Sequence, residues 1–313
     1  MSGKTAFLFP GQGSQASGMG KDAAERNPQA RALFERADAI LGLPLTQLCF
    51  EGPEDKLKPT EITQPALYVS SAATLEVLRA AGHAPGAVAG HSLGEYTALY
   101  AAGVFDFETG LRLVRARGLA MAEAGTHAPG AMAAILGLDG AKVEELCAAA
   151  SDKGVVVAAN FNDPGQTVVS GSPEGVAALC EAAKAAGAKR ALPLPVSGAF
   201  HSPLVQPAAE TMRAALADAK LQPPACLFIN NADAKALSDP EAIRDSLVRQ
   251  VVSPVRWVAS VEALSAAGFS TFVEVGAGKV LKGLVGRIRK EAVCHSTEGA
   301  AAMDAALAAL AAG

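Results

Sequence analysis

Short runs of hydrophobic residues alternate with longer segments rich in alanine and leucine over most of the chain. Compact apolar runs at residues 5–9, 84–90 and 271–275 are typical of buried strands, and each ends at a glycine or at Pro-Gly. The spacing of apolar residues predicts helices over residues 65–81, 92–102, 108–124 and 205–216. This alternation predicts an α/β protein with a mainly parallel sheet and helices on both faces.

The middle of the chain follows a different pattern. Strand-like runs at 132–138, 155–160, 166–171 and 189–196 enclose helical segments at 141–151 and 173–186. The turn at 162–165, Asn-Asp-Pro-Gly, suits a hairpin and would interrupt a helix. Because this βαββαβ order is that of a ferredoxin-like unit, we expect such a subdomain at 128–197, inserted into a body formed by 1–127 and 198–313.

Composition excludes several classes of protein. Of the 313 residues, 50% are hydrophobic and 19% are charged, which is unlike a disordered chain. The formal net charge of -4 gives no overall attraction to nucleic acid or to an anionic membrane. The five cysteines lack CxxC spacing, which argues against a zinc site and against a disulfide framework. We therefore expect a cytoplasmic protein without a metal, a membrane anchor or a nucleic-acid partner.

The segment Gly90-His91-Ser92-Leu93-Gly94 matches the pattern G-x-S-x-G between a predicted strand and a predicted helix. A sharp turn of this kind exposes the serine hydroxyl, and glycines on either side let the backbone turn tightly. The N–H group of Leu93 would then point at the oxyanion that forms during attack on a carbonyl group. We predict that Ser92 is a nucleophile.

A nucleophilic serine needs a general base nearby. The chain has five histidines, and we favour His201 because it lies in a loop just before a helix, where the chain leaves the inserted segment. No carboxylate suited to orienting it is evident, and an α/β-hydrolase would carry its acid and histidine later in the chain. A serine–histidine dyad, with the imidazole N–H donated to a neutral acceptor, fits the sequence better.

The predicted helix 108–124 carries three arginines, and one of them lies on its apolar face. Arg117 falls within the apolar stripe, whereas Arg112 and Arg115 are expected to be solvated. A buried guanidinium must be paired. Two interpretations remain open at this point: a structural ion pair with an acidic residue, or a clamp for the carboxylate of a substrate.

The segment 11–16, Gly-Gln-Gly-Ser-Gln-Ala, imitates a dinucleotide-binding fingerprint after a strand. That fingerprint requires an acidic residue at the end of a second strand about 20 residues later. Residues 29–41 instead have a helical pattern, so Glu35 would not lie at a strand end. We expect this segment to line an active-site pocket, with Gln12 as a polar donor.

The motifs together resemble those of the malonyl-CoA:acyl-carrier-protein transacylases of type II fatty acid synthesis. The matching segments are FPGQGSQ (9–15), GHSLGEY (90–96), Arg117-Gly118, GAFHS (198–202), VRQ (248–250) with Pro254-Val255, and VGAGKVL (275–281). They extend over essentially the whole chain, and the combination is much more specific than any single motif.

The resemblance implies a role for each matching residue. Ser92 would be acylated, His201 would be the base, and the main-chain carbonyl of Gln250 would accept the imidazole N–H. The backbone N–H groups of Gln12 and Leu93 would form the oxyanion hole. The family has a hydrolase-like α/β body with a ferredoxin-like subdomain, as the pattern above also indicates.

The resemblance also implies the substrate. Arg117 would hold the malonyl carboxylate, and Phe200 resembles the malonyl-selective pattern, in which a bulky ring disfavours an α-methyl branch. The reaction would be ping-pong transfer of malonyl from malonyl-CoA to the phosphopantetheine thiol of holo-acyl carrier protein. No cofactor is implied. Ala277 departs from the proline that is more common in the family.

Partners and competing classes follow from these expectations. Because carrier proteins are acidic, the cationic residues Lys279, Lys282, Arg287, Arg289 and Lys290 are candidates for docking. We expect a monomer, and a role in polyketide synthesis stays open. The competing classes are a serine hydrolase or thioesterase, which would release free acid, and a non-catalytic carrier-binding module, which would form no acyl-serine.

Overall fold

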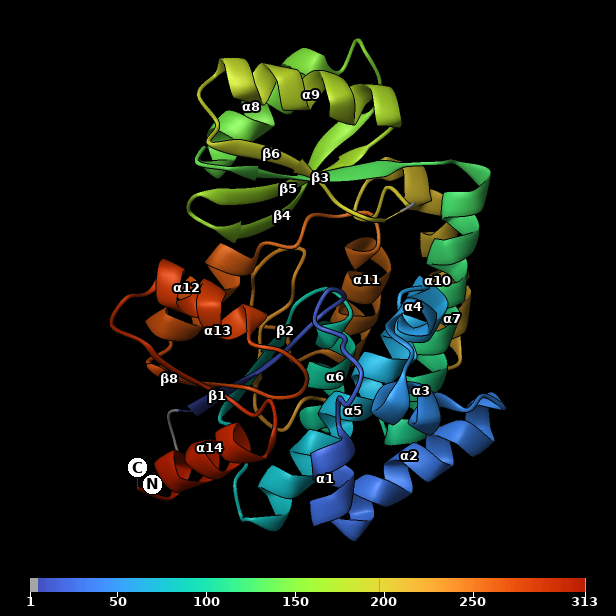
Figure 1. The fold of residues 1–313 in the computed structure, drawn as a ribbon, viewed down its shortest axis with the longest axis vertical. Helices are drawn as coiled ribbons and strands as arrows, with labels where there is room; N and C mark the ends of the chain where they lie inside the picture. Colours follow the sequence, from blue (N-terminus) through green and yellow to red (C-terminus); the bar gives the residue numbers. More distant parts are fainter. Residues whose placement is uncertain (1–4, 197, 313) are drawn as a thin grey trace.

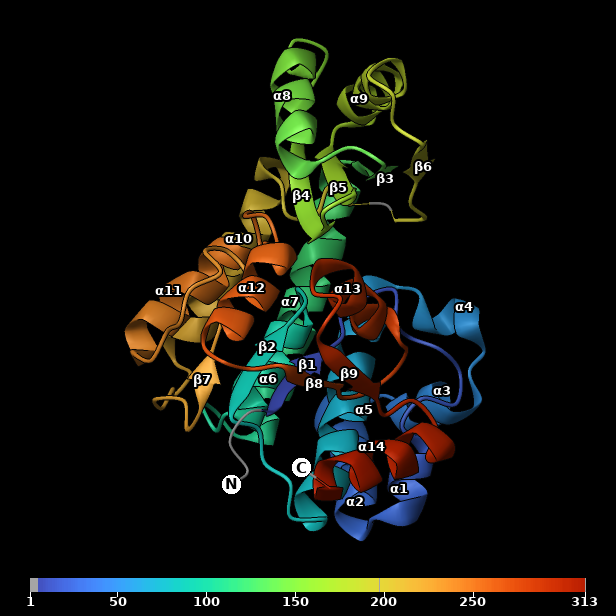
Figure 2. The same cartoon turned by 90° about the vertical axis from the view of Figure 1, so that its left-hand side faces the viewer.

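Two β-sheets with helices on their faces form the frame of the molecule (Figures 1 and 2). The computed structural model describes residues 5–196 and 198–312. Residue 197, the last residue of the predicted subdomain, therefore lies outside the described residues. The mixed α/β class with a parallel sheet, predicted from the sequence, is confirmed.

The larger sheet has five parallel strands in the order β7-β2-β1-β8-β9. These strands are β1 (Thr5–Phe9), β2 (Ala87–Gly90), β7 (Leu227–Phe228), β8 (Thr271–Glu274) and β9 (Val293–Ser296). Along β1, Phe7 and Phe9 pack into one hydrophobic cluster, whereas Ala6 and Leu8 pack into another. Because successive side chains point to opposite faces, both faces of this strand are buried, which explains its unbroken apolar run.

Two groups of helices cover the two faces of this sheet. The cluster around Phe7 and Phe9 includes α2 (Pro28–Leu41), α5 (Thr60–Ala80), α6 (Gly94–Ala101), α7 (Phe107–His127), α10 (Gln206–Ala217) and α11 (Pro240–Gln250). The cluster around Ala6 and Leu8 includes α12 (Trp257–Ala266) and α13 (Val280–Ile288). Buried residues of five further elements also belong to the cluster around Phe7 and Phe9: α1 (Lys21–Arg26), α3 (Leu45–Glu51), α4 (Glu54–Leu57), the 3₁₀ turn Pro203–Val205 and α14 (Ala300–Ala312).

The helix predicted at 65–81 begins earlier, at Thr60, and encloses Pro65. Proline has no N–H group, so it cannot bond the carbonyl four residues before it. That carbonyl belongs to Glu61, and it accepts a hydrogen bond of 2.6 Å from Arg115 on α7 instead. Arg115 is therefore half-buried and not fully solvated as expected, and its side chain satisfies the backbone group that Pro65 leaves free.

The smaller sheet is antiparallel, with strand order β4-β5-β3-β6. The strands of this sheet and the two helices between them follow one another along the chain as β3 (Ala131–Leu136), α8 (Gly140–Ala150), β4 (Val156–Asp163), β5 (Gln166–Gly171), α9 (Pro173–Ala185) and β6 (Arg190–Pro193). A separate hydrophobic cluster joins this sheet to α8 and α9. Each element overlaps one that the sequence predicts, and Figure 1 shows both helices on the outer face.

Strand β4 connects the smaller sheet to the rest of the molecule. The N–H of Val255 donates to the carbonyl of Ala159, and the N–H of Phe161 donates to the carbonyl of Val255. Bulges within β4 let the strand continue to Asp163, so Asn162 lies in the strand and not in the turn predicted at 162–165. This extension brings Asn162 to His91, the residue before Ser92.

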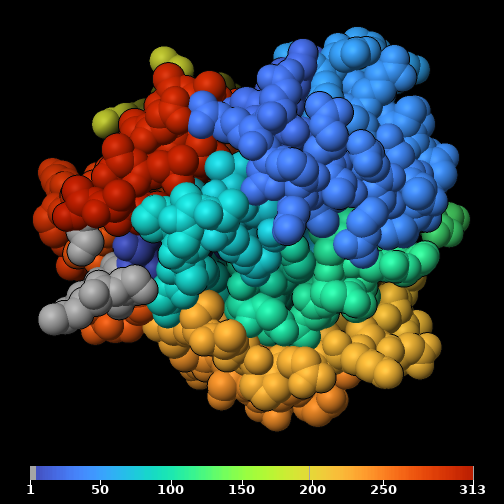
Figure 3. Space-filling view, turned by 90° about the horizontal axis from the view of Figure 1, so that it is seen from below, coloured from blue at the N-terminus to red at the C-terminus, as the bar shows by residue number. Residues whose placement is uncertain are grey.

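Helices α1 and α14 lie side by side at the end of the molecule away from the smaller sheet (Figures 1 and 2). Seen from that end, α14 and the N-terminal helices form adjoining parts of the surface (Figure 3). Arg26 on α1 and Asp304 on α14 form an ion pair of 2.6 Å there. Within the described residues, no helix is long and apolar enough to cross a membrane.

Candidate active site

Ser92 occupies a sharp turn between β2 and α6, with a backbone φ of 51°. Such a left-handed conformation is uncommon for a residue other than glycine and is typical of strained functional turns. A Cβ atom at Gly90 would overlap the backbone of Gly94, and one at Gly94 would overlap the carbonyl of Phe9. The glycines of the G-x-S-x-G pattern are therefore required by the close approach of β1, β2 and α6.

His201 lies against the serine. Its Nε2 atom is 2.8 Å from Ser92 Oγ, and its Nδ1 atom is 3.0 Å from the carbonyl oxygens of both Gln250 and Ser253. Because carbonyl oxygens only accept hydrogen bonds, Nδ1 must carry the proton, and Nε2 offers its lone pair to the serine hydroxyl. No acidic residue suited to orienting this histidine was evident in the sequence, and in the structure two backbone carbonyls orient it instead.

Burial keeps the imidazole neutral. His201 is enclosed among α7, α11 and the serine turn, and burial together with the Arg117 cation lowers its pKa to about 3. A histidine that stays neutral over the physiological range can accept the serine proton.

Arg117 is the third group at the serine hydroxyl. Its Nη2 atom donates to Ser92 Oγ at 3.1 Å and to Gln250 Oε1 at 2.9 Å, and its Nη1 atom donates to Gln64 Oε1 at 2.9 Å. Only 1% of the side chain's surface is exposed. Among the described residues no carboxylate lies within ion-pair distance of it, so the structural ion pair considered above is not what holds this arginine.

Asn231 holds the serine turn from the side of β7. Its Oδ1 atom accepts from the N–H of Ser92 at 2.7 Å, and its Nδ2 atom donates to the carbonyl of Gly90 at 2.6 Å. The side chain thus bonds both ends of the turn. Sequence reasoning missed this residue, because 139 positions separate it from Ser92.

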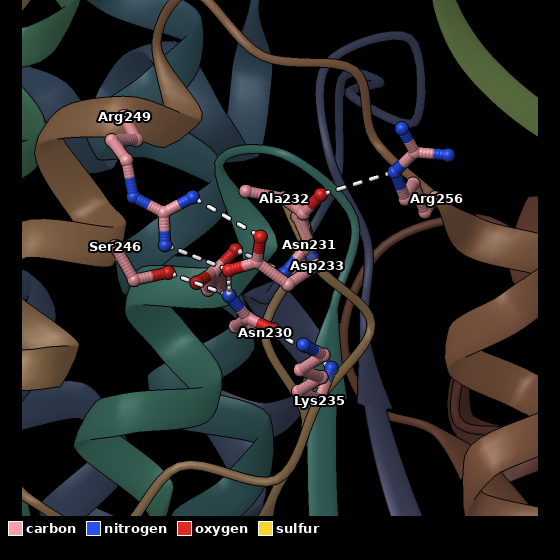
Figure 4. Close-up of polar contacts among 9 residues, drawn as sticks. Asn230, Asn231, Ala232, Asp233, Lys235, Ser246, Arg249 and Arg256 are labelled. Atoms are coloured by element: carbon pink, nitrogen blue, oxygen red, sulfur yellow. Dashed lines mark hydrogen bonds and ion pairs between the residues drawn. The ribbon is translucent and has the colours of Figure 1, made fainter.

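The tight loop at 230–235 positions Asn231 (Figure 4). The Nδ2 atom of Asn230 donates to Asp233 Oδ2 and to Ser246 Oγ, and its Oδ1 atom accepts from the N–H of Lys235. Arg249 bonds both carboxylate oxygens of Asp233, at 3.1 and 2.7 Å. These contacts fix the loop to α11, the helix that also supplies Gln250.

His91, next to Ser92, points away from the serine side chain. Its Nε2 atom is 2.8 Å from Asn162 Oδ1 on β4, and its ring lies 5.5 Å from the ring of Trp257. Burial lowers the pKa of this histidine. His91 therefore links the serine turn to the smaller sheet.

Gln12 and Leu93 flank the serine turn. Leu93 is buried at the start of α6, and the loop of Gln12 follows Gly11, where a Cβ atom would overlap the carbonyl of His91. The side chain of Gln12 accepts from Thr60 Oγ1 at 3.0 Å. In the described part of the chain neither the Leu93 nor the Gln12 N–H donates a hydrogen bond, so both are available to an oxyanion.

Phe200 precedes His201 and is buried. Its ring lies where a Cβ atom on Gly198 would stand, so the glycine lets the ring fold back over the backbone. Its effect on branched acyl groups stays a prediction.

The loop at 11–16 is not followed by the second strand that a dinucleotide-binding fingerprint requires. Residues 28–41 form a helix, so Glu35 is not at a strand end, as the sequence indicated. Within residues 5–196 and 198–312 no cluster of three metal-ligating side chains occurs, and the five cysteines are free.

A serine hydroxyl in contact with a neutral histidine, at the end of a parallel strand, defines the class of serine enzymes that transfer or hydrolyse acyl groups. A family model described as the acyl transferase domain matches residues 6–305. The malonyl CoA-acyl carrier protein transacylase of Escherichia coli K12 is 47% identical over 303 residues, which cover 96% of this chain and 98% of that protein.

Solved structures give the same result. The acyl-carrier-protein S-malonyltransferase of Burkholderia pseudomallei has a TM-score of 0.93 at 46% identity and covers 97% of this chain and 99% of its own. A malonyl-transacylase in complex with a type II PKS acyl-carrier protein has a TM-score of 0.94 at 42% identity, with coverages of 98% and 99%. The chain therefore belongs to the acyl transferase family, among the malonyl-CoA:acyl-carrier-protein transacylases. The family resemblance inferred from the sequence is confirmed.

Proposed function

We propose that the protein transfers the malonyl group of malonyl-CoA to the phosphopantetheine thiol of holo-acyl carrier protein through a malonyl-Ser92 intermediate. The observation that carries this proposal is the meeting of a base and a cation at one oxygen. Ser92 Oγ lies 2.8 Å from His201 Nε2 and 3.1 Å from Arg117 Nη2. The first group can take the serine proton, and the second suits the carboxylate that distinguishes malonyl from acetyl.

In the first half-reaction, Ser92 Oγ attacks the thioester carbonyl while its proton passes to His201 Nε2. The oxyanion accepts hydrogen bonds from the backbone N–H groups of Leu93 and Gln12. When the intermediate collapses, the C–S bond breaks and His201 returns the proton to the sulfur of coenzyme A. Since the Nδ1 proton is bonded to carbonyl groups, the ring keeps one orientation through both transfers.

The malonyl carboxylate takes the arginine contact that the serine hydroxyl accepts in the free site. Arg117 then binds an anion, which offsets the positive charge that lowers the pKa of His201. Binding of malonyl thereby makes His201 a stronger base at the moment of attack, an effect that an acetyl group lacks.

In the second half-reaction, the phosphopantetheine thiol gives its proton to His201 and its sulfur attacks the malonyl ester. Ser92 Oγ leaves and recovers the proton. A related malonyl-transacylase has been solved in complex with an acyl-carrier protein, which supports a carrier protein as the acceptor. Arg117 would fix the malonyl group in a geometry suited to the thiol, so that transfer outpaces hydrolysis.

We also propose the division of the chain implied by the family. Residues 1–127 and 198–313 would form the hydrolase-like body that carries the site, and 128–197 the ferredoxin-like subdomain. The separate hydrophobic cluster of β3, β4, β5, α8 and α9 supports this division. His91–Asn162 and the backbone bonds of Val255 would then join the two parts beside the nucleophile.

Product analysis tests the proposed reaction. The purified protein is mixed with malonyl-CoA, with and without holo-acyl carrier protein, and malonyl-carrier and free malonate are measured. We expect malonyl-carrier to account for nearly all turnover when the carrier is present. Rapid release of malonate that the carrier does not suppress would instead identify a hydrolase.

A further inference from the structure

Glu95 is a buried carboxylate beside the active site, and the mechanism above does not use it. It lies in the first turn of α6, three residues after the nucleophile, and its side chain is 0% exposed. Its Oε2 atom accepts from the N–H of Asn231 at 3.1 Å and from Gln250 Nε2 at 2.9 Å. Its Oε1 atom has no partner among the described residues. A buried carboxylate is costly, so its presence requires an explanation.

The side-chain amide of Gln250 connects Glu95 to the arginine. Gln250 Nε2 donates to Glu95 Oε2 and to the carbonyl of Ser92, both at 2.9 Å, whereas Gln250 Oε1 accepts from Arg117 Nη2 at 2.9 Å. The chain of contacts is therefore carboxylate, amide, guanidinium. It brings together residues that lie 155 positions apart.

The direction of this amide is set by its partners. A carboxylate only accepts hydrogen bonds and a guanidinium only donates them. With Glu95 on one side, the NH₂ group of Gln250 must face the carboxylate, and its oxygen must face Arg117. The reversed amide would place NH₂ against the guanidinium and oxygen against the carboxylate, which is repulsive at both ends.

We propose that Glu95 is a positioning residue for malonyl selection: through the amide of Gln250 it holds the guanidinium of Arg117 at the nucleophile and supplies the negative charge nearest to it in the free enzyme. This inference rests on the proposed malonyl transfer and adds the residue that keeps the carboxylate-binding group in place. The main-chain N–H of Asn231 donates to the same carboxylate oxygen, so Glu95 contacts both the residue that holds the serine turn and the residue that holds Arg117.

The test is Glu95→Gln, with rates of Ser92 acylation measured at pH 8 by intact mass for malonyl-CoA and for acetyl-CoA. An uncharged amide at position 95 no longer fixes the direction of Gln250, so Arg117 is held less well. We expect acylation by malonyl-CoA to fall about tenfold while acylation by acetyl-CoA changes less than about threefold. A merely structural defect would lower both rates equally.

The matched control is Glu274→Gln. Glu274 is also 0% exposed, but it binds the N–H groups of Leu281 and Lys282 at the start of α13, away from the serine. We expect its malonyl-to-acetyl ratio to equal that of the unchanged protein. If Glu95→Gln fails to fold, Gln250→Met tests the same contact, because it removes the bridging amide and keeps the main-chain carbonyl that binds His201. The same loss of preference is expected.

An unchanged malonyl-to-acetyl ratio in the folded variant would overturn the role of Glu95 while leaving the proposed transfer intact. Absence of any malonyl-Ser92 in the unchanged protein would overturn the proposed function itself, and the role of Glu95 with it.

Discussion

Arg117 places one guanidinium nitrogen 3.1 Å from the hydroxyl oxygen of Ser92. The two residues come from different elements, α7 and the turn before α6, and the guanidinium is buried without a carboxylate at ion-pair distance among the described residues. Its hydrogen-bond acceptors are neutral, and burial lowers its pKa. A buried cation held by neutral groups is well suited to bind an anion.

Replacing this cation should abolish the preference for malonyl. In Arg117→Ala, malonyl loses a charge-assisted hydrogen bond worth about 1.5–3 kcal/mol, which corresponds to roughly 10- to 150-fold in kcat/KM. Acetyl loses nothing comparable. The measurement is the ratio of kcat/KM for the two thioesters. Arg112→Ala is the control, because Arg112 is exposed on the same helix and pairs with Glu108. An unchanged ratio in Arg117→Ala would show that another group binds the carboxylate.

The same substitution should change the pH dependence of acylation by acetyl-CoA. Burial and the Arg117 cation together lower the pKa of His201 to about 3. A base works only when neutral, so activity falls as the pH drops through its pKa. Removing the cation raises that pKa, and the acidic limb of the profile should move to higher pH in Arg117→Ala. If the acidic limb of the variant's profile coincides with that of the unchanged protein, Arg117 does not lower the pKa of His201.

Two buried carboxyls should make the fold less stable as the pH rises. Burial raises the pKa of Glu95 and of Glu274 to about 7, above the value of 4.5 for a solvated glutamate. Because the folded state then holds the proton more tightly, the stability that each of these two carboxyls contributes is fully present below pH 4.5 and is lost as the pH rises to about 7. Each carboxyl contributes a fall of about 3 kcal/mol in the free energy of unfolding.

Urea denaturation between pH 4.5 and 8 measures this effect. The fall should be smaller in Glu95→Gln and in Glu274→Gln, since an amide does not titrate. Equal slopes in the variants and the unchanged protein would mean that neither carboxyl titrates in this window.

Reversing charge on α13 should weaken binding of the carrier protein. Lys282 is exposed, whereas Arg287 pairs with Asp163 at 2.5 Å, so Lys282 is the freer of the two. We expect Lys282→Glu with Arg287→Glu to raise KM for holo-acyl carrier protein, more at low salt than at high salt, and to leave KM for malonyl-CoA unchanged. The control is Lys21→Glu, on α1. A KM for the carrier that does not change would place the docking surface elsewhere.

Local sequence signals were sufficient for much of the fold. The apolar runs of β1 and β8 and the amphipathic spacing of α7 depend on residues that are close in sequence, and the structure has these elements where the pattern predicts them. The start of α5 was missed because a proline inside a helix imitates a helix start. The hydrogen bond that compensates for the proline, from Arg115 to the carbonyl of Glu61, joins two separate helices, so no local pattern predicts it.

Some residues of the candidate site likewise have a local sequence signal, and others do not. The turn at Ser92 has a local signature of glycines, and the inward direction of Arg117 follows from helical spacing. Asn231 and the side chain of Gln250 have no such signal, because the packing of α11 and the loop at 230–235 brings them to the serine. Glu95 did have a local signal, because it is the only charged residue of the buried helix α6.

The measurement that tests the central claim most directly is intact-mass analysis after brief mixing with malonyl-CoA, with acetyl-CoA in parallel and Ser92→Ala as the control. We predict a malonyl adduct on Ser92 that is absent from the variant, much weaker with acetyl-CoA, and discharged by holo-acyl carrier protein with formation of malonyl-carrier. Malonyl-carrier formed at full rate without any adduct, or by Ser92→Ala, would contradict the account.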